Sequence, residues 1–92
     1  MDSVTARIRV YGLVQMVGFR YYAMRQAEKF GVNGYVRNMP DGGVETVAQG
    51  KRTAIEEFIK QIEAGPHGSR ITSTDVKWLD QSPRYDGFHI AL

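Results

Sequence analysis

The nine residues from Gly12 to Arg20, GLVQMVGFR, have the composition of an anion-binding turn. Glycine lets the backbone bend through positive φ, and a tight bend of this kind points successive N–H groups into one concavity. The segment lies between a strand-like and a helix-like pattern, so the free N–H groups and positive dipole end of the next helix add further donors. Arg20 contributes a planar set of donors that matches phosphate or carboxylate. These residues predict an anion site, with an ordinary turn and a solvated arginine as the alternative.

The glycine spacing in this turn fits neither the Walker A loop nor the dinucleotide-binding fingerprint. No other known phosphate motif takes its place, so residue types alone leave the two interpretations about even. The elements around the turn must therefore show what it faces.

Hydrophobic periodicity divides the chain into alternating strands and amphipathic helices. A period of two at Ala6, Ile8 and Val10 predicts a first strand that Gly12 closes. A helix follows over 21–30 and stops at Gly31, and strands 34–38 and 44–49 then form a hairpin around the turn 39–43. A second helix runs from a Thr53/Glu56 capping box to Gly65-Pro66. The last two elements are a strand over 72–79 and a short strand with Phe88, Ile90 and Leu92.

This order, β-α-β-β-α-β with a short terminal strand, predicts a single α+β domain over residues 1–92 with the ferredoxin-like split βαβ pattern. Two helices then pack on one face of an antiparallel sheet. The first two strands run parallel with the third between them, so their carboxyl ends lie at one edge, roughly 10 Å apart. One end carries the loop to Arg20 and the other carries Asn38. The topology therefore predicts that Arg20 and Asn38 share one site.

Composition excludes several classes of chemistry. The chain has 92 residues, no cysteine and a formal charge of +2, so disulfides, thiolate metal sites and cysteine nucleophiles are ruled out. A charge of +2 is a weak field and does not favour nucleic acid. His67 and His89 have no second ligand at metal spacing, and we expect no metal. With no apolar run long enough to span a bilayer, we expect a soluble, cytoplasmic monomer.

Two motifs taken together resemble the acylphosphatase family. They are the loop Val14 to Arg20 and the stretch Gly34-Tyr35-Val36-Arg37-Asn38 followed by Pro40-Asp41-Gly42. The later segment 44–50 is also similar, and the resemblance spans essentially the whole chain.

The resemblance implies hydrolysis of the carboxyl–phosphate bond of small acyl phosphates to a carboxylate and inorganic phosphate, which also acts as a competing ligand. It implies no cofactor, no metal and no covalent intermediate. Backbone N–H groups of Met16 to Arg20 would wrap the phosphate, the Arg20 side chain would grip it, and Asn38 would hold the attacking water. Gln15, Met16, Val17, Gly18, Phe19 and Arg20 are thus the substrate-binding segment, with Gln15 holding the loop through backbone hydrogen bonds.

One position departs from the family, which usually has glycine where this chain has Met16. If the loop needs positive φ there, a non-glycine residue costs about 1–2 kcal/mol. The other possibility is that Met16 adopts an ordinary β or right-handed conformation at no cost. A strained loop leaves open a second function, an anion-binding or regulatory module whose turnover is reduced or lost.

A ferredoxin-like layout also builds RNA-recognition domains. Those domains stack bases on aromatic residues of the central strands, and the segment Val44 to Gln49 has none. We therefore expect no nucleic acid partner. Strand alternation turns Arg37 away from Asn38, so we expect Arg37 to be exposed to solvent.

Overall fold

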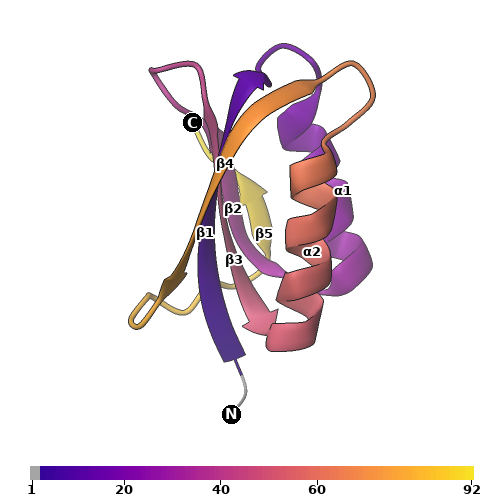
Figure 1. The fold of residues 1–92 in the computed structure, drawn as a ribbon. Helices are drawn as coiled ribbons and strands as arrows, with labels where there is room; N and C mark the ends of the chain where they lie inside the picture. Colours follow the sequence, from indigo (N-terminus) through magenta and orange to yellow (C-terminus); the bar gives the residue numbers. More distant parts are fainter. Residues whose placement is uncertain (1–2) are drawn as a thin grey trace.

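The computed structural model describes residues 3–92, so Met1 and Asp2 of the predicted domain lie outside the described residues. The elements are β1 (Ser3–Leu13), α1 (Phe19–Phe30), β2 (Asn33–Asn38), β3 (Val44–Lys51), α2 (Arg52–Ala64), β4 (Arg70–Leu79) and β5 (Phe88–Ile90). Both helices cover the same face of one sheet (Figure 1). The predicted α+β, ferredoxin-like order is confirmed. No helix in the described range has the length and apolar character needed to cross a membrane.

The sheet has the strand order β4-β1-β3-β2-β5. β3 pairs antiparallel with both β1 and β2, so those two strands run parallel to each other on either side of it. The prediction of a purely antiparallel sheet is wrong at one edge, because β5 pairs parallel with β2. The connection from β4 crosses from one edge of the sheet to the other, which gives β5 the same direction as β2.

The core lies between the sheet and the two helices. Alternation along β1 places Ala6, Ile8 and Val10 against the helices, with no exposed surface. The helices contribute the apolar stripes that their periodicity predicts, and these buried residues are Phe19, Ala23 and Ala27 of α1 and Ile55, Phe58 and Ile62 of α2. Trp78 is 36% exposed, and the centroid of its ring lies 4.3 Å from the Arg52 guanidinium carbon. Its exposure follows from its place on the edge strand β4.

Several element boundaries differ from the sequence prediction. β1 runs past Gly12 to Leu13, with a register shift against β4 between Tyr11 and Gly12. At Gly12 φ is +125°, and a Cβ would collide with the Arg70 carbonyl oxygen, so this irregularity requires glycine. The Thr53 capping box is wrong, because α2 begins at Arg52 with Lys51 as its N-cap and no side-chain cap. The strand before it continues to Lys51 and occupies the residues that a cap would need.

The sheet face opposite the helices carries a nearly buried carboxylate. Glu45 is 3% exposed. It pairs with Arg9 (Nη2 to Oε2, 2.8 Å) and Arg37 (Nε to Oε1, 2.9 Å), and Tyr35 donates its hydroxyl to Oε1 at 3.0 Å. The prediction of a simply solvent-exposed Arg37 is therefore wrong, since its cross-strand partner is an acid. Burial by itself raises the pKa of Glu45, but the hydrogen bonds from Arg37, Arg9 and Tyr35 outweigh it and hold that pKa below its ordinary value of 4.5.

This carboxylate predicts a pH-dependent contribution to stability. Because the folded pKa of Glu45 is depressed, its contribution is present above about pH 4.5 and is lost as the pH falls through the folded pKa. We expect Glu45→Gln to lower the free energy of unfolding by about 1–3 kcal/mol at neutral pH. As the pH falls through the folded pKa, the difference from wild type should shrink, because the carboxyl then becomes protonated as well. Urea unfolding at neutral pH and at a series of acidic pH values measures this, and an equal loss at every pH would contradict it.

Candidate active site

Arg20 and Asn38 line the same pocket, with a volume of about 260 Å³. The pocket lies where β1 and β2 end, beside the first turn of α1. Its walls come from the loop after β1 and from α1, β2 and β5, and the lining residues are Val14, Met16, Gly18, Phe19, Arg20, Tyr21, Asn38 and Ile90. The two side chains are 18 positions apart in sequence, and the topology brings them together because β3 alone separates the strands that precede them.

Left-handed backbone shapes the loop between β1 and α1. Met16 has φ of 65°, and Gly18, with φ of 78° and ψ of 21°, is the N-cap of α1. The N-cap makes no side-chain hydrogen bond, and the first turn contains no acidic residue. Because the first four N–H groups of a helix have no partner within the helix, the start of α1 retains donors and a positive dipole end at the pocket.

Arg20 adds a full positive charge to this end of the helix. Its side chain is half-buried, and none of the ion pairs among residues 3–92 involves it. The guanidinium and the helix dipole have the same sign, and a bound dianion would offset both.

Asn38 ends β2 on the sheet face that the helices cover. It is half-buried, and its carboxamide makes no hydrogen bond within the part of the chain that the structure describes. The carboxamide carries both donors and acceptors, so it is able to orient a water molecule in the pocket.

Gln15 does not line the pocket. Its Nε2 donates to the carbonyl oxygens of Met39 and Gly43, both at 2.9 Å. These bonds tie the loop after β1 to the turn between β2 and β3, and the two strand ends that carry Arg20 and Asn38 are thereby fixed to each other. The Gln15 side chain supports the site and is not free for a ligand.

Two of the predicted loop residues, Val17 and Phe19, pack their side chains against the core. Phe19 is 2% exposed, and its ring packs edge-on against Tyr22 at a centroid distance of 6.0 Å. Val17 packs against the core and is absent from the pocket wall. These two side chains anchor the loop to the domain, so its main chain is held against the start of α1.

Sequence reasoning missed Val14, Tyr21 and Ile90 in the wall. Val14 belongs to the recognised loop and Tyr21 follows Arg20, so proximity in sequence gave a signal for both. Ile90 had none, because only the parallel docking of β5 on β2 brings the end of the chain to this edge.

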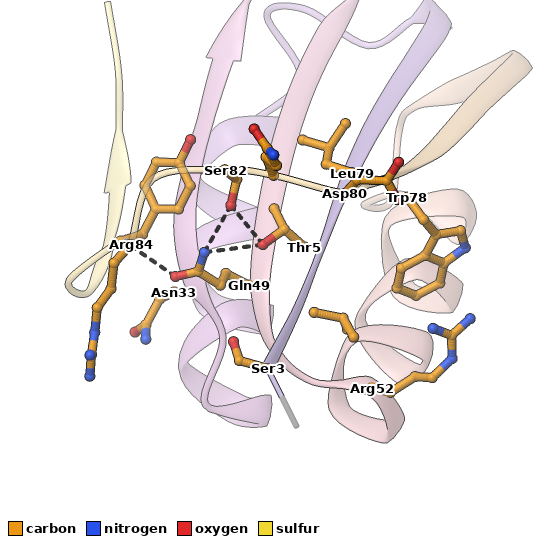
Figure 2. Close-up of a pocket in the computed structure, with 13 residues that line it drawn as sticks. Ser3, Thr5, Asn33, Gln49, Arg52, Trp78, Leu79, Asp80, Ser82 and Arg84 are labelled. Carbon is orange, nitrogen blue, oxygen red and sulfur yellow. Dashed lines mark hydrogen bonds between the residues drawn. The ribbon is translucent and has the colours of Figure 1, made fainter. Parts of the chain in front are cut away.

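A larger hollow of about 1020 Å³ lies at the other end of the sheet. It is lined by Thr5 near the start of β1 and Asn33 at the start of β2, and the rise per residue from Thr5 to Leu13 places it about 26 Å along β1 from the loop that precedes Arg20. Figure 2 shows Gln49 at its centre, with Nε2 donating to Thr5 and Ser82 at 3.0 and 3.1 Å. Gln49 Oε1 also accepts from the backbone N–H of Tyr85 at 2.8 Å. These hydrogen bonds hold the β4–β5 connection on the sheet, so the polar groups that line this hollow have a structural role.

Neither hollow contains a cluster suited to a metal. Across residues 3–92, no group of three or more histidine, aspartate or glutamate side chains is placed to hold a metal ion.

Comparison with known proteins identifies the family of this chain. The acylphosphatase family model matches residues 6–90. An acylphosphatase from Thermococcus kodakarensis is 43% identical over 90 residues, 98% of each chain, and one from Anaeromyxobacter dehalogenans is 40% identical over 89 residues, 97% of this chain and 96% of the relative. The crystal structure of acylphosphatase from Bacillus subtilis superposes with a TM-score of 0.93 at 34% identity, covering 97% of this chain and 99% of that one.

A split βαβ sheet with a small pocket at the uncapped start of its first helix defines the general class of this domain. The match over nearly the whole chain goes further, and the chain belongs to the acylphosphatase family.

The left-handed conformation at Met16 predicts a gain in stability on substitution by glycine. The left-handed form costs a non-glycine residue about 1–2 kcal/mol, and the greater freedom of unfolded glycine returns about 0.5–1 kcal/mol of that. We therefore expect Met16→Gly to raise the free energy of unfolding by up to about 1 kcal/mol, measured by urea denaturation. Met16→Ala keeps the Cβ, and because the methionine side chain is fully exposed it should stay within about 0.5 kcal/mol of wild type. An equal gain for alanine would show that the backbone strain is not the cause.

Proposed function

We propose that this protein hydrolyses small acyl phosphates at the pocket that holds Arg20 and Asn38. Acylphosphatases act on small acyl phosphates. The observation that carries the assignment to these residues is their convergence in one 260 Å³ pocket beside an uncapped helix start.

The phosphoryl group of the substrate is a dianion, and two features of the pocket match its charge. The main-chain N–H groups from Met16 to Arg20 surround it, and the Arg20 guanidinium binds two of its oxygens. Such preorganised donors stabilise the charge that is spread over the oxygens in the transition state. Gln15 keeps the cradle in register with Asn38 through its two bonds to the turn.

Asn38 orients the attacking water. The water oxygen forms a bond to phosphorus while the bond from phosphorus to the carboxyl oxygen breaks, and the carboxylate leaves with the electron pair. The water proton passes to a phosphate oxygen, so the products are a carboxylate and inorganic phosphate. A carboxylate is a weakly basic leaving group, and positioning by a neutral amide is therefore sufficient without a strong general base.

Water is the only co-reactant in this scheme, and no cofactor or metal has a role in it. The product phosphate occupies the same cradle as the substrate phosphoryl group, so it should inhibit competitively.

We infer a monomeric, cytoplasmic protein that acts on free small molecules. RNA binding is not favoured, because β3 carries no aromatic residue. A module without turnover is not favoured either, because the chain belongs to the acylphosphatase family and Met16 keeps its N–H donor in spite of its left-handed backbone.

The first test is hydrolysis of benzoyl phosphate with EDTA present. We expect an unchanged rate after metal removal, since the scheme needs no Lewis acid. Loss of activity in EDTA that a divalent ion restores would overturn the metal-free scheme.

Arg20→Ala should remove both phosphate affinity and turnover, with kcat/KM falling at least about 10²–10³-fold, as for loss of an oxyanion donor. Lys29→Ala removes the same charge from the last turn of the same helix and should leave both nearly unchanged. Steady-state kinetics and inhibition by inorganic phosphate measure the two effects. Equal behaviour of the two variants would place the phosphate elsewhere.

Asn38→Ala should separate binding from turnover. We expect kcat to fall by roughly 10²-fold, because the water loses its orientation, while the inhibition constant for inorganic phosphate stays within about twofold. Asn33→Ala, at the other end of β2, is the matched control. A parallel loss of phosphate affinity in the Asn38 variant would assign that residue to binding.

A further inference from the structure

The pocket has an apolar rim that its phosphate chemistry does not use. Six large hydrophobic side chains are exposed among the described residues, and three of them line this pocket. Met16 is 100% exposed, Tyr21 58% and Ile90 38%. Scattered exposed hydrophobic residues are ordinary, but their convergence on one concave site is informative.

These three residues come from separate elements. Met16 belongs to the loop after β1, Tyr21 to α1 and Ile90 to β5, so no single amphipathic stripe explains their convergence. The Arg25 guanidinium carbon lies 5.9 Å from the centroid of the Tyr21 ring, which keeps that ring on the helix surface.

Met16 contributes least to the fold. Its backbone is left-handed, at a cost to stability, and its side chain buries no surface. A long, flexible thioether beside an anion cradle is suited to contact with an apolar group of variable shape.

The covalent structure of an acyl phosphate determines which part of the substrate lies near these three side chains. The phosphoryl group must face the start of α1 and Arg20, where the donors are. The acyl group is bonded to that phosphoryl group through one oxygen, so it lies within reach of the other residues that line the same small pocket. Burial of its methylene groups against Met16, Tyr21 and Ile90 would remove apolar surface of both partners from water.

We propose that Met16, Tyr21 and Ile90 form an acyl-binding rim, and that this protein prefers acyl phosphates with an apolar acyl group over acetyl phosphate. The proposal rests on the proposed function, because it names the substrate class of the same site. The side chains of the three residues determine specificity and take no part in the chemical step, whereas the main-chain N–H of Met16 belongs to the phosphate cradle.

The test compares acetyl phosphate with hexanoyl phosphate, whose leaving groups are both aliphatic carboxylates and differ in four methylene groups. The measured quantity is the selectivity ratio, kcat/KM for hexanoyl phosphate divided by kcat/KM for acetyl phosphate. In a closed hydrophobic pocket a single methylene group changes kcat/KM by about 10-fold or more. This rim is open, so each methylene contributes less, and we expect the four additional methylene groups of hexanoyl phosphate to give a ratio of about 10 or more for the wild type.

Two variants change polarity with little change in shape. Met16→Gln keeps the length and the Cβ of the side chain, and Ile90→Thr keeps the β-branch that suits a strand. Each should lower the selectivity ratio by about threefold and the double variant by about tenfold, mainly through KM for hexanoyl phosphate. For Ile90→Thr, which lies outside the phosphate-binding loop, the kcat for acetyl phosphate and the inhibition constant for inorganic phosphate should stay within about twofold of wild type.

Leu92→Gln is the matched control. Leu92 is an exposed apolar residue two positions after Ile90, and it does not line the pocket. It should leave the selectivity ratio unchanged. A general folding defect would reduce turnover of both substrates together, so the ratio separates that effect from a specific one.

The outcomes distinguish failure of the acyl-binding rim from failure of the proposed function. Hydrolysis of both substrates with a wild-type ratio near one, or with a ratio that the double variant leaves unchanged, would overturn the rim and leave the proposed function intact. Failure to hydrolyse either substrate would overturn the proposed function and the rim with it.

Discussion

β3 lies between β1 and β2 and pairs antiparallel with both, and the site depends on this arrangement. It makes the two flanking strands parallel and brings their carboxyl ends to one edge of the sheet, a fixed distance apart. The loop after one strand supplies the anion cradle and the last residue of the other supplies the carboxamide. Gln15 then bridges from the loop to the turn that joins β2 to β3.

The positive groups at that edge, the start of α1 and the Arg20 guanidinium, are not neutralised by acidic side chains of the described residues. The start of α1 has no acidic residue in its first turn, and no carboxylate within residues 3–92 is ion-paired with Arg20. On the other face of the sheet the charges are neutralised, because Glu45 forms ion pairs with Arg9 and Arg37 and accepts a hydrogen bond from Tyr35. Neutralised charges stabilise the sheet, whereas the uncompensated ones are available to an anion.

Strain and exposure coincide in the same loop. A fold selected only for stability would have glycine at a position with φ of 65°, and it would not extend a methionine side chain fully into solvent. Both features lie beside the pocket, next to Tyr21 and Ile90. One pocket wall thus holds the Arg20 guanidinium together with three exposed hydrophobic side chains, and the proposal assigns these two kinds of group to the two halves of an acyl phosphate.

The sequence by itself determined the elements, the split βαβ order and the pairing of Arg20 with Asn38, because hydrophobic periodicity and turn residues are local and the topology follows from their order. It also identified Gln15 as a support for the loop. It did not determine the conformation of Met16, the ion cluster around Glu45 or the parallel docking of β5, which delivers Ile90 to the pocket. Those features are set by contacts between residues distant in sequence, where strand neighbours and packing decide which backbone angles and which charge partners are available.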